Sequence, residues 1–200
     1  MGLTIDNSTL MRALNEVDQR LFAYHGTKIH YTLNVVSGFA LLMNMVKVDT
    51  DEYTDIDYIC PSFLTDVKEI IDKVGIEYGL GKGWINNDDL LDGASLKDIE
   101  YITGPLNFKP TLELNVFTIN VLDLYGILKM KIIAVDTTQM TVGVTNDFTR
   151  ARDFKDIRDL MSKLEITTSE LKREMHNYVM EPNIFDLIDE FNKTGSNKYT

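Results

Sequence analysis

Cysteine and basic residues are scarce in this sequence. Its single cysteine, Cys60, excludes a framework of intramolecular disulfides. The 20 Lys and Arg residues against 31 Asp and Glu give a formal net charge of −11. Because phosphate contacts need clustered Lys and Arg, we expect no general nucleic-acid-binding surface. Binding of a single nucleotide or of one locally docked RNA end stays compatible with this charge.

Long apolar runs are also missing. No stretch approaches the roughly 20 apolar residues that a membrane-spanning helix needs, and no charged-then-apolar signal segment opens the chain. We therefore expect no membrane association and a cytoplasmic location. His25, His30 and His176 show no spacing typical of zinc catalysis. With a hydrophobic content of 44%, the chain can build an ordinary globular core.

Hydrophobic periodicity predicts an α+β fold, with a small mixed sheet flanked by helices and a C-terminal helical tail. Helices are expected near 10–21, 38–46, 64–74, 122–135, 153–164, 167–180 and 184–191, and strands near 29–36, 55–59, 98–103 and 111–119. We expect a core at 1–150 and a helical segment packed on it at 151–200, with a disordered end from about residue 193.

The glycine-rich segment 79–83 invites comparison with a phosphate-binding loop. That loop needs a glycine five residues before its Gly-Lys pair and a Ser or Thr after it, where this chain has Ile76 and Gly83. A flexible turn leading to Trp84 is the alternative that we favour.

Asp55 and Asp57 are separated only by Ile56 on an expected strand. Side chains at i and i+2 of a strand point to one face, so the two carboxylates can converge on a shared cation. A divalent metal, a basic partner, a raised pKa or exposure to water would each relieve their repulsion. Of these, the metal has an obvious chemistry; a structural pair satisfied by backbone donors and water is the alternative.

The order of these motifs resembles the nucleotidyltransferase-like superfamily, in particular uncharacterised bacterial branches near the AbiEii abortive-infection toxins. A strand, the pair Ser37-Gly38, a helix and then the Asp-Ile-Asp strand carry the resemblance, together with residues 80–86, 128–134 and 150–157. The resemblance covers roughly residues 30–165 and implies the fold of that superfamily.

The resemblance also implies a set of site residues. Asp55 and Asp57 would be catalytic and hold Mg²⁺ or Mn²⁺, while Ser37 and Gly38 would receive the phosphates of a nucleotide. Glu113 is the candidate third carboxylate, although its strand presents Asn115 as an alternative. Lys131 is a candidate contact for a phosphate or a base.

Two functions follow from the resemblance. The first is a metal-dependent nucleotidyltransferase that moves a nucleoside monophosphate from a nucleoside triphosphate to a protein or RNA acceptor. The second is a catalytically degenerate binding module of a toxin–antitoxin or phage-defence system, with an antitoxin protein as partner. Acidic residues at 49, 51 and 52, before the Asp-Ile-Asp strand, are unfavourable near phosphates unless a metal neutralises them or they face solvent.

Overall fold

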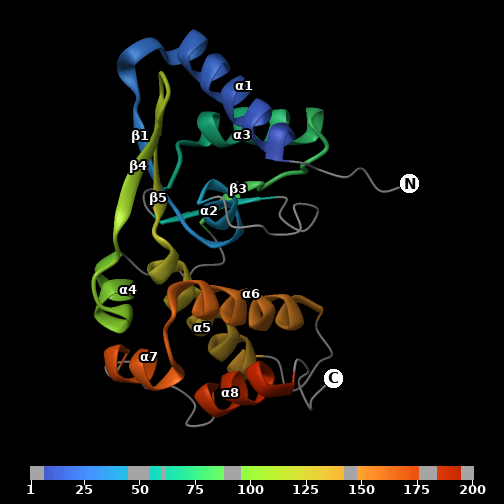
Figure 1. The fold of residues 1–200 in the computed structure, drawn as a ribbon. Helices are drawn as coiled ribbons and strands as arrows, with labels where there is room; N and C mark the ends of the chain where they lie inside the picture. Colours follow the sequence, from blue (N-terminus) through green and yellow to red (C-terminus); the bar gives the residue numbers. More distant parts are fainter. Residues whose placement is uncertain are drawn as a thin grey trace. The chain divides into compact units, whose positions relative to one another are not determined.

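The structure is a computed structural model that describes residues 7–44, 55–59, 62–87, 96–141, 148–175 and 184–194. The chain divides into two compact units (Figure 1). The first comprises Met1–Lys97 and Asn107–Asp123, and the second comprises Asp98–Leu106 and Leu124–Thr200. These units divide at a different place from the expected ranges 1–150 and 151–200.

Within the described residues, the first unit contains a five-stranded mixed sheet in the order β3-β2-β1-β5-β4. β1 runs parallel to β5 and antiparallel to β2, which in turn runs parallel to β3; β4 and β5 are antiparallel. The expected α+β class is therefore confirmed. The strands span Tyr31–Val35 (β1), Ile56–Ile59 (β2), Ile85–Asn86 (β3), Phe108–Glu113 (β4) and Phe117–Leu122 (β5).

The α-helices described in the first unit are α1 (Asn7–His25), α2 (Ser37–Met43) and α3 (Thr65–Glu77), and a short 3-10 helix, Gly26–Lys28, follows α1. The expected stop at Gly26 is confirmed, because α1 ends at His25 and Gly26 has φ +60°, a conformation that glycine adopts without a steric penalty. Residues 45–54 before β2 and Cys60 after it lie outside the described residues.

One face of the sheet forms the core of this unit. Tyr31, Tyr58 and Phe117 lie on β1, β2 and β5, and their rings surround Phe63 at centroid distances of 5.1, 5.1 and 6.3 Å. Leu33 and Val35, the next core-facing residues of β1, are fully buried. Thr32 and Asn34 alternate with them and are more exposed, so β1 has one apolar and one polar side.

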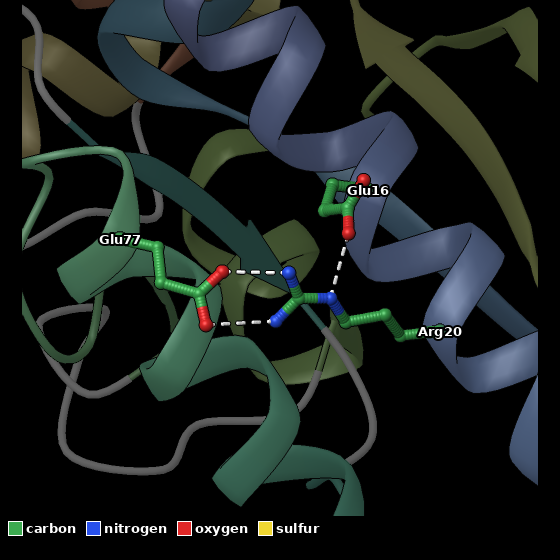
Figure 2. Close-up of polar contacts among 3 residues, drawn as sticks. All are labelled: Glu16, Arg20 and Glu77. Carbon is green, nitrogen blue, oxygen red and sulfur yellow. Dashed lines mark hydrogen bonds and ion pairs between the residues drawn. The ribbon is translucent and has the colours of Figure 1, made fainter.

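Helices α1 and α3 pack against each other, and an ion pair joins them at the surface (Figure 2). The Arg20 guanidinium contacts both carboxylate oxygens of Glu77, at 3.0 and 2.6 Å, and also Glu16 at 2.7 Å. The hydrogen bonds from Arg20 lower the pKa of Glu77. This two-pronged geometry fixes the spacing of the two helices better than a single contact would.

The glycine-rich segment has a packing role. Trp84 is almost fully buried and donates a hydrogen bond from its Nε1 to the carbonyl of Ile71, at 2.9 Å. A Cβ atom on Gly75 would lie 2.3 Å from the Trp84 ring and 2.1 Å from the carbonyl oxygen of Gly81. Glycines 79, 81 and 83 all have positive φ angles, between 69° and 85°. The segment is therefore a tight turn that places a core tryptophan.

Two expected elements differ in the structure. Residues 98–103, expected as a strand, belong to helix α4 (Leu96–Thr103), which buries Ile99 and Thr103 one turn apart. The expected strand 111–119 is divided between β4 and β5, because the chain turns at residues 114–116. The Asp18 carboxylate of α1 fixes this turn by accepting hydrogen bonds from the amides of Asn115 and Val116, at 3.2 and 2.7 Å.

The second unit is helical in its described residues. Besides α4 it contains α5 (Leu124–Thr141), α6 (Phe148–Leu164), α7 (Thr168–Glu174) and α8 (Ile184–Thr194). Helix α7 begins with the expected capping box between Thr167 and Glu170. Helix α5 extends beyond the expected end at residue 135, and the expected disordered end beyond residue 194 lies outside the described residues. In the part of the chain described, no helix is long and apolar enough to cross a membrane.

Candidate functional site

The Ser37-Gly38 turn and the Asp-Ile-Asp segment meet at one corner of the sheet. β1 and β2 are antiparallel, with Val35 opposite Tyr58. One residue further, the amide of Val36 donates a hydrogen bond of 2.9 Å to the carbonyl of Asp57. Since α2 begins at Ser37, the turn into this helix lies directly beside the start of β2. Two motifs that are about 20 residues apart in the sequence are thus neighbours in the fold.

Asp57 is the second residue of β2, and Asp55 immediately precedes this strand. Both residues are partly exposed, whereas Ile56 between them is fully buried. The backbone of Ile56 is anchored by a hydrogen bond from its amide to the carbonyl of Trp84, at 2.6 Å. Ile56 is therefore fixed in the core between the two aspartates. Its hydrogen bond to Trp84 links the position of the pair to the glycine-rich turn.

Ser37 has a φ angle of 62°, which lies in the left-handed region. A residue with a Cβ atom is strained there by roughly 1–2 kcal/mol, and such strain is concentrated at functional sites. The following residue, Gly38, is buried. This conformation lets the chain leave β1 and enter α2 abruptly, beside Asp57.

Asp57 shares a face of the sheet with two asparagines. Asn34 lies opposite Ile59 on the antiparallel neighbour, so its side chain points to the same face as Ile59 and Asp57. Asn120 is in register with Asn34 on the parallel neighbour β5, and its amide group donates a hydrogen bond of 3.0 Å to Asn34 Oδ1. Asn34 and Asn120 thus lie side by side on β1 and β5, and Asp57 is diagonal to Asn34, all on the face opposite the Phe63 cluster.

Glu113 is not brought to this corner. β4, which carries it, is three strand spacings from β2, or about 14 Å at the usual spacing of roughly 4.8 Å. Its carboxylate accepts a hydrogen bond of 2.8 Å from Thr118 Oγ1, which also lies 2.8 Å from His30 Nε2. The expectation that Glu113 completes a metal site with Asp57 has no support from the strand order. The alternative, Asn115, is bound to Asp18 at 2.7 Å.

The structure draws attention to an acidic residue that the sequence analysis missed. Asp123 follows the last residue of β5, and its amide donates a hydrogen bond to the carbonyl of Asn107. Extending the register of β1 and β5 by two residues beyond Val35 and Val121 places it level with Ser37. The sequence analysis did not single out Asp123, because it assigned residues 122–135 to one helix.

Lys131 belongs to the second unit. Its ammonium group is buried and forms ion pairs with Asp153 at 2.6 Å and Asp156 at 2.9 Å. Burial by itself lowers the pKa of Lys131, but the two carboxylates outweigh it, so that the pKa is raised. These contacts join α5 to α6. The role of Lys131 in nucleotide binding therefore stays a prediction, and its described contacts serve the packing of the two helices.

The donor set at the corner suits a hard cation. Aspartate oxygens are ligands that Mg²⁺ and Mn²⁺ accept, and Mg²⁺ usually takes only one or two protein carboxylates and fills its other positions with water and phosphate oxygens. Among the described residues, no group of three or more His, Cys, Asp or Glu side chains is arranged to hold a metal ion. Asp55 and Asp57 would therefore hold such an ion together with its phosphate ligand.

Comparison of the chain with protein-family models, curated proteins and solved structures finds no match in any of the three. The resemblance to the nucleotidyltransferase-like superfamily thus stays a prediction that depends on the motifs themselves and on the corner that they form.

Proposed function

We propose that this protein binds a nucleoside triphosphate with Mg²⁺ or Mn²⁺ at the corner formed by Ser37, Gly38, Asp55 and Asp57, and transfers a nucleoside monophosphate from it to a hydroxyl group of a protein or RNA acceptor. The observation that carries this proposal is the hydrogen bond from the Val36 amide to the Asp57 carbonyl, because it joins the Ser-Gly turn to the acidic pair. The order of motifs along the chain supports it independently.

Each residue has a role that its chemistry permits. Asp55 and Asp57 would hold the cation, which would supply positive charge to the phosphate oxygens. Ser37 is partly exposed and its hydroxyl can donate a hydrogen bond to a phosphate oxygen, whereas Gly38 beside it is buried and shapes the turn. The acceptor oxygen attacks the α-phosphorus, the bond from that phosphorus to the bridging oxygen breaks, and pyrophosphate leaves. The hydroxyl proton passes to a carboxylate or to water.

Asp123 is the residue that we favour for a supporting acidic role, in place of Glu113. It is one strand from β1 at the level of Ser37, whereas Glu113 is on the far edge strand. A carboxylate two strand spacings from Asp57 is about 10 Å away at the backbone. Asp123 would therefore be better placed to act on the acceptor than to hold the same ion as Asp57.

The alternative function is a nucleotide-binding module without transfer activity, acting with an antitoxin partner in a cytoplasmic defence system. It is favoured by the strand order, which separates Glu113 from the acidic pair. Both functions require the binding of metal and nucleotide. They differ in whether a nucleoside monophosphate is transferred to an acceptor.

The test is incubation of the protein with each of the four α-labelled nucleoside triphosphates and Mg²⁺ or Mn²⁺, in the presence of cell extract as a source of acceptors. The matched control is the double variant Asp55→Ala, Asp57→Ala. If label appears in protein or RNA with the wild type and not with the double variant, the result supports transfer. Metal-dependent binding without label transfer favours the alternative, and absence of binding contradicts both.

A further inference from the structure

The Asn34–Asn120 pair lies on the same face of the sheet as Asp57 and has more hydrogen-bonding capacity than the described residues satisfy. Asn120 Nδ2 donates to Asn34 Oδ1 at 3.0 Å. Among the described residues, none donates a hydrogen bond to the buried Oδ1 atom of Asn120. A buried amide oxygen without a hydrogen-bond partner destabilises a folded protein by roughly 1–3 kcal/mol, so its presence needs an explanation.

This conclusion does not depend on which way the two amides are turned. If both amides are rotated by half a turn, Asn34 becomes the donor and Asn120 the acceptor. The nitrogen of Asn120 then takes the place of its oxygen and lacks an acceptor instead. In either arrangement, one polar atom of Asn120 needs a partner that can donate or accept. A hydroxyl group can do both.

The pair is close to the candidate metal corner and on the same face. Asn34 and Asp57 are diagonal neighbours on antiparallel strands, because Asn34 is opposite Ile59. Diagonal neighbours have backbone positions about 7–8 Å apart. Asn120 lies directly beside Asn34 on the next strand. If the charged end of a ligand binds at Asp57, the neighbouring part of that ligand can contact Asn34 and Asn120.

We propose that Asn34 and Asn120 form a subsite for the ribose hydroxyls of the nucleotide, which makes the protein selective for ribonucleotides over deoxyribonucleotides. The inference depends on the proposed function, since it places the phosphates at Asp57. The sugar is the part of a nucleotide that is joined directly to the phosphates, so its hydroxyls are the first neutral polar groups beyond them. An amide pair, unlike a carboxylate, binds them without adding charge beside the phosphates.

The experiment measures the affinity of the wild type, with Mg²⁺, for whichever nucleoside triphosphate binds best, and for its 2′-deoxy and 3′-deoxy analogues. Isothermal titration calorimetry gives the three dissociation constants. We expect at least one deoxy analogue to bind about tenfold more weakly, as the loss of one buried hydrogen bond implies. In Asn120→Leu, which keeps the size but removes the polar atoms, the ribonucleotide should bind no better than the deoxy analogue.

Thr118→Val is the matched control. Thr118 lies on the same strand and the same face, two residues from Asn120 and further from Asp57, and its hydroxyl is engaged with Glu113. This variant should keep the tenfold preference. If Asn120→Leu does not fold, as judged by circular dichroism, Asn34→Ala on the neighbouring strand gives the same comparison.

The outcomes separate the two proposals. Equal binding of all three nucleotides by the wild type, or an undiminished preference in Asn120→Leu and Asn34→Ala, overturns the sugar subsite alone, provided that binding still depends on Asp57. Absence of any nucleotide binding by the wild type overturns the proposed function and the subsite with it.

Discussion

The amide of Val36 and the carbonyl of Asp57 are joined by a hydrogen bond of 2.9 Å, one residue before the chain enters its left-handed turn at Ser37. This contact continues the pairing of β1 with β2 beyond Val35 and Tyr58. It makes the backbone conformation at Ser37 and the position of the Asp57 carboxylate parts of one local structure.

Ser37→Gly should stabilise the protein by up to about 1 kcal/mol, because glycine adopts a positive φ without the steric clash that strains serine. Urea unfolding measures this. Glu165, whose φ angle is 54°, is the other described non-glycine residue in this conformation, and Glu165→Gly is the matched control. Both variants should be more stable, but only Ser37→Gly should bind nucleotide more weakly. If Ser37→Gly leaves nucleotide affinity unchanged, the serine side chain has no part in the site.

Gly75→Ala should destabilise the protein by about 1–3 kcal/mol or more, because the new methyl group would overlap the Trp84 ring and the Gly81 carbonyl. Denaturant unfolding followed by the fluorescence of Trp84, the only tryptophan, reports the change directly. Gly26→Ala is the control, since no atom lies within 4 Å of its Cβ position and only backbone strain is added. Equal losses in the two variants would show that the contact with Trp84 does not matter.

The sequence predicted the elements β1, α2 and β2 well, because the apolar runs and the Ser-Gly pair are local signals. The strand expected at 98–103 was wrong for a physical reason. The six residues Asp-Ile-Glu-Tyr-Ile-Thr also place Ile99 and Thr103 on one side of a helix, and Thr103 Oγ1 donates to the Ile99 carbonyl at 3.0 Å. A segment this short does not distinguish the two periods.

The placement of Glu113 could not be predicted for a different reason. The turn that separates β4 from β5 is held by Asp18, which is 97 residues away from Asn115 in the sequence. Such a tertiary partner leaves no local signal, so the chain from 111 to 119 resembled one continuous strand. That turn makes β4 and β5 antiparallel neighbours, and β4 with Glu113 is an edge strand.

Lys131→Met should lower the free energy of unfolding by about 3–5 kcal/mol, because it leaves the Asp153 and Asp156 carboxylates without their buried cation. The raised pKa of Lys131 means that its contribution is fully present below the unfolded pKa of about 10.5 and is lost as the pH rises through the folded pKa. Urea unfolding at pH 7 and at higher pH measures both effects. Lys163→Met, at an exposed position of α6, should change stability by less than about 0.5 kcal/mol.

Glu77→Gln should weaken the contact between α1 and α3 slightly, because it removes the charge that pairs with Arg20. The pKa of Glu77 is lowered by this contact, so the contribution is present above the unfolded pKa of about 4.5 and disappears as the pH falls through the folded pKa. Thermal unfolding of the wild type and the variant should therefore differ at pH 7 and converge in acid. Glu69→Gln, an exposed change on the same helix, should show no such convergence.

The central claim is that Asp57 holds a cation together with a nucleotide. The most direct test is the melting temperature of the wild type and of Asp57→Asn, each with Mg²⁺, with nucleotide and with both. A ligand at 100 times its dissociation constant stabilises the folded state by about 2.7 kcal/mol, so saturating binding is readily measured. We predict that the wild type is stabilised more by metal and nucleotide together than by either alone, and that this increase is absent in Asp57→Asn. An increase that is missing in the wild type, or unchanged in the variant, would contradict the claim.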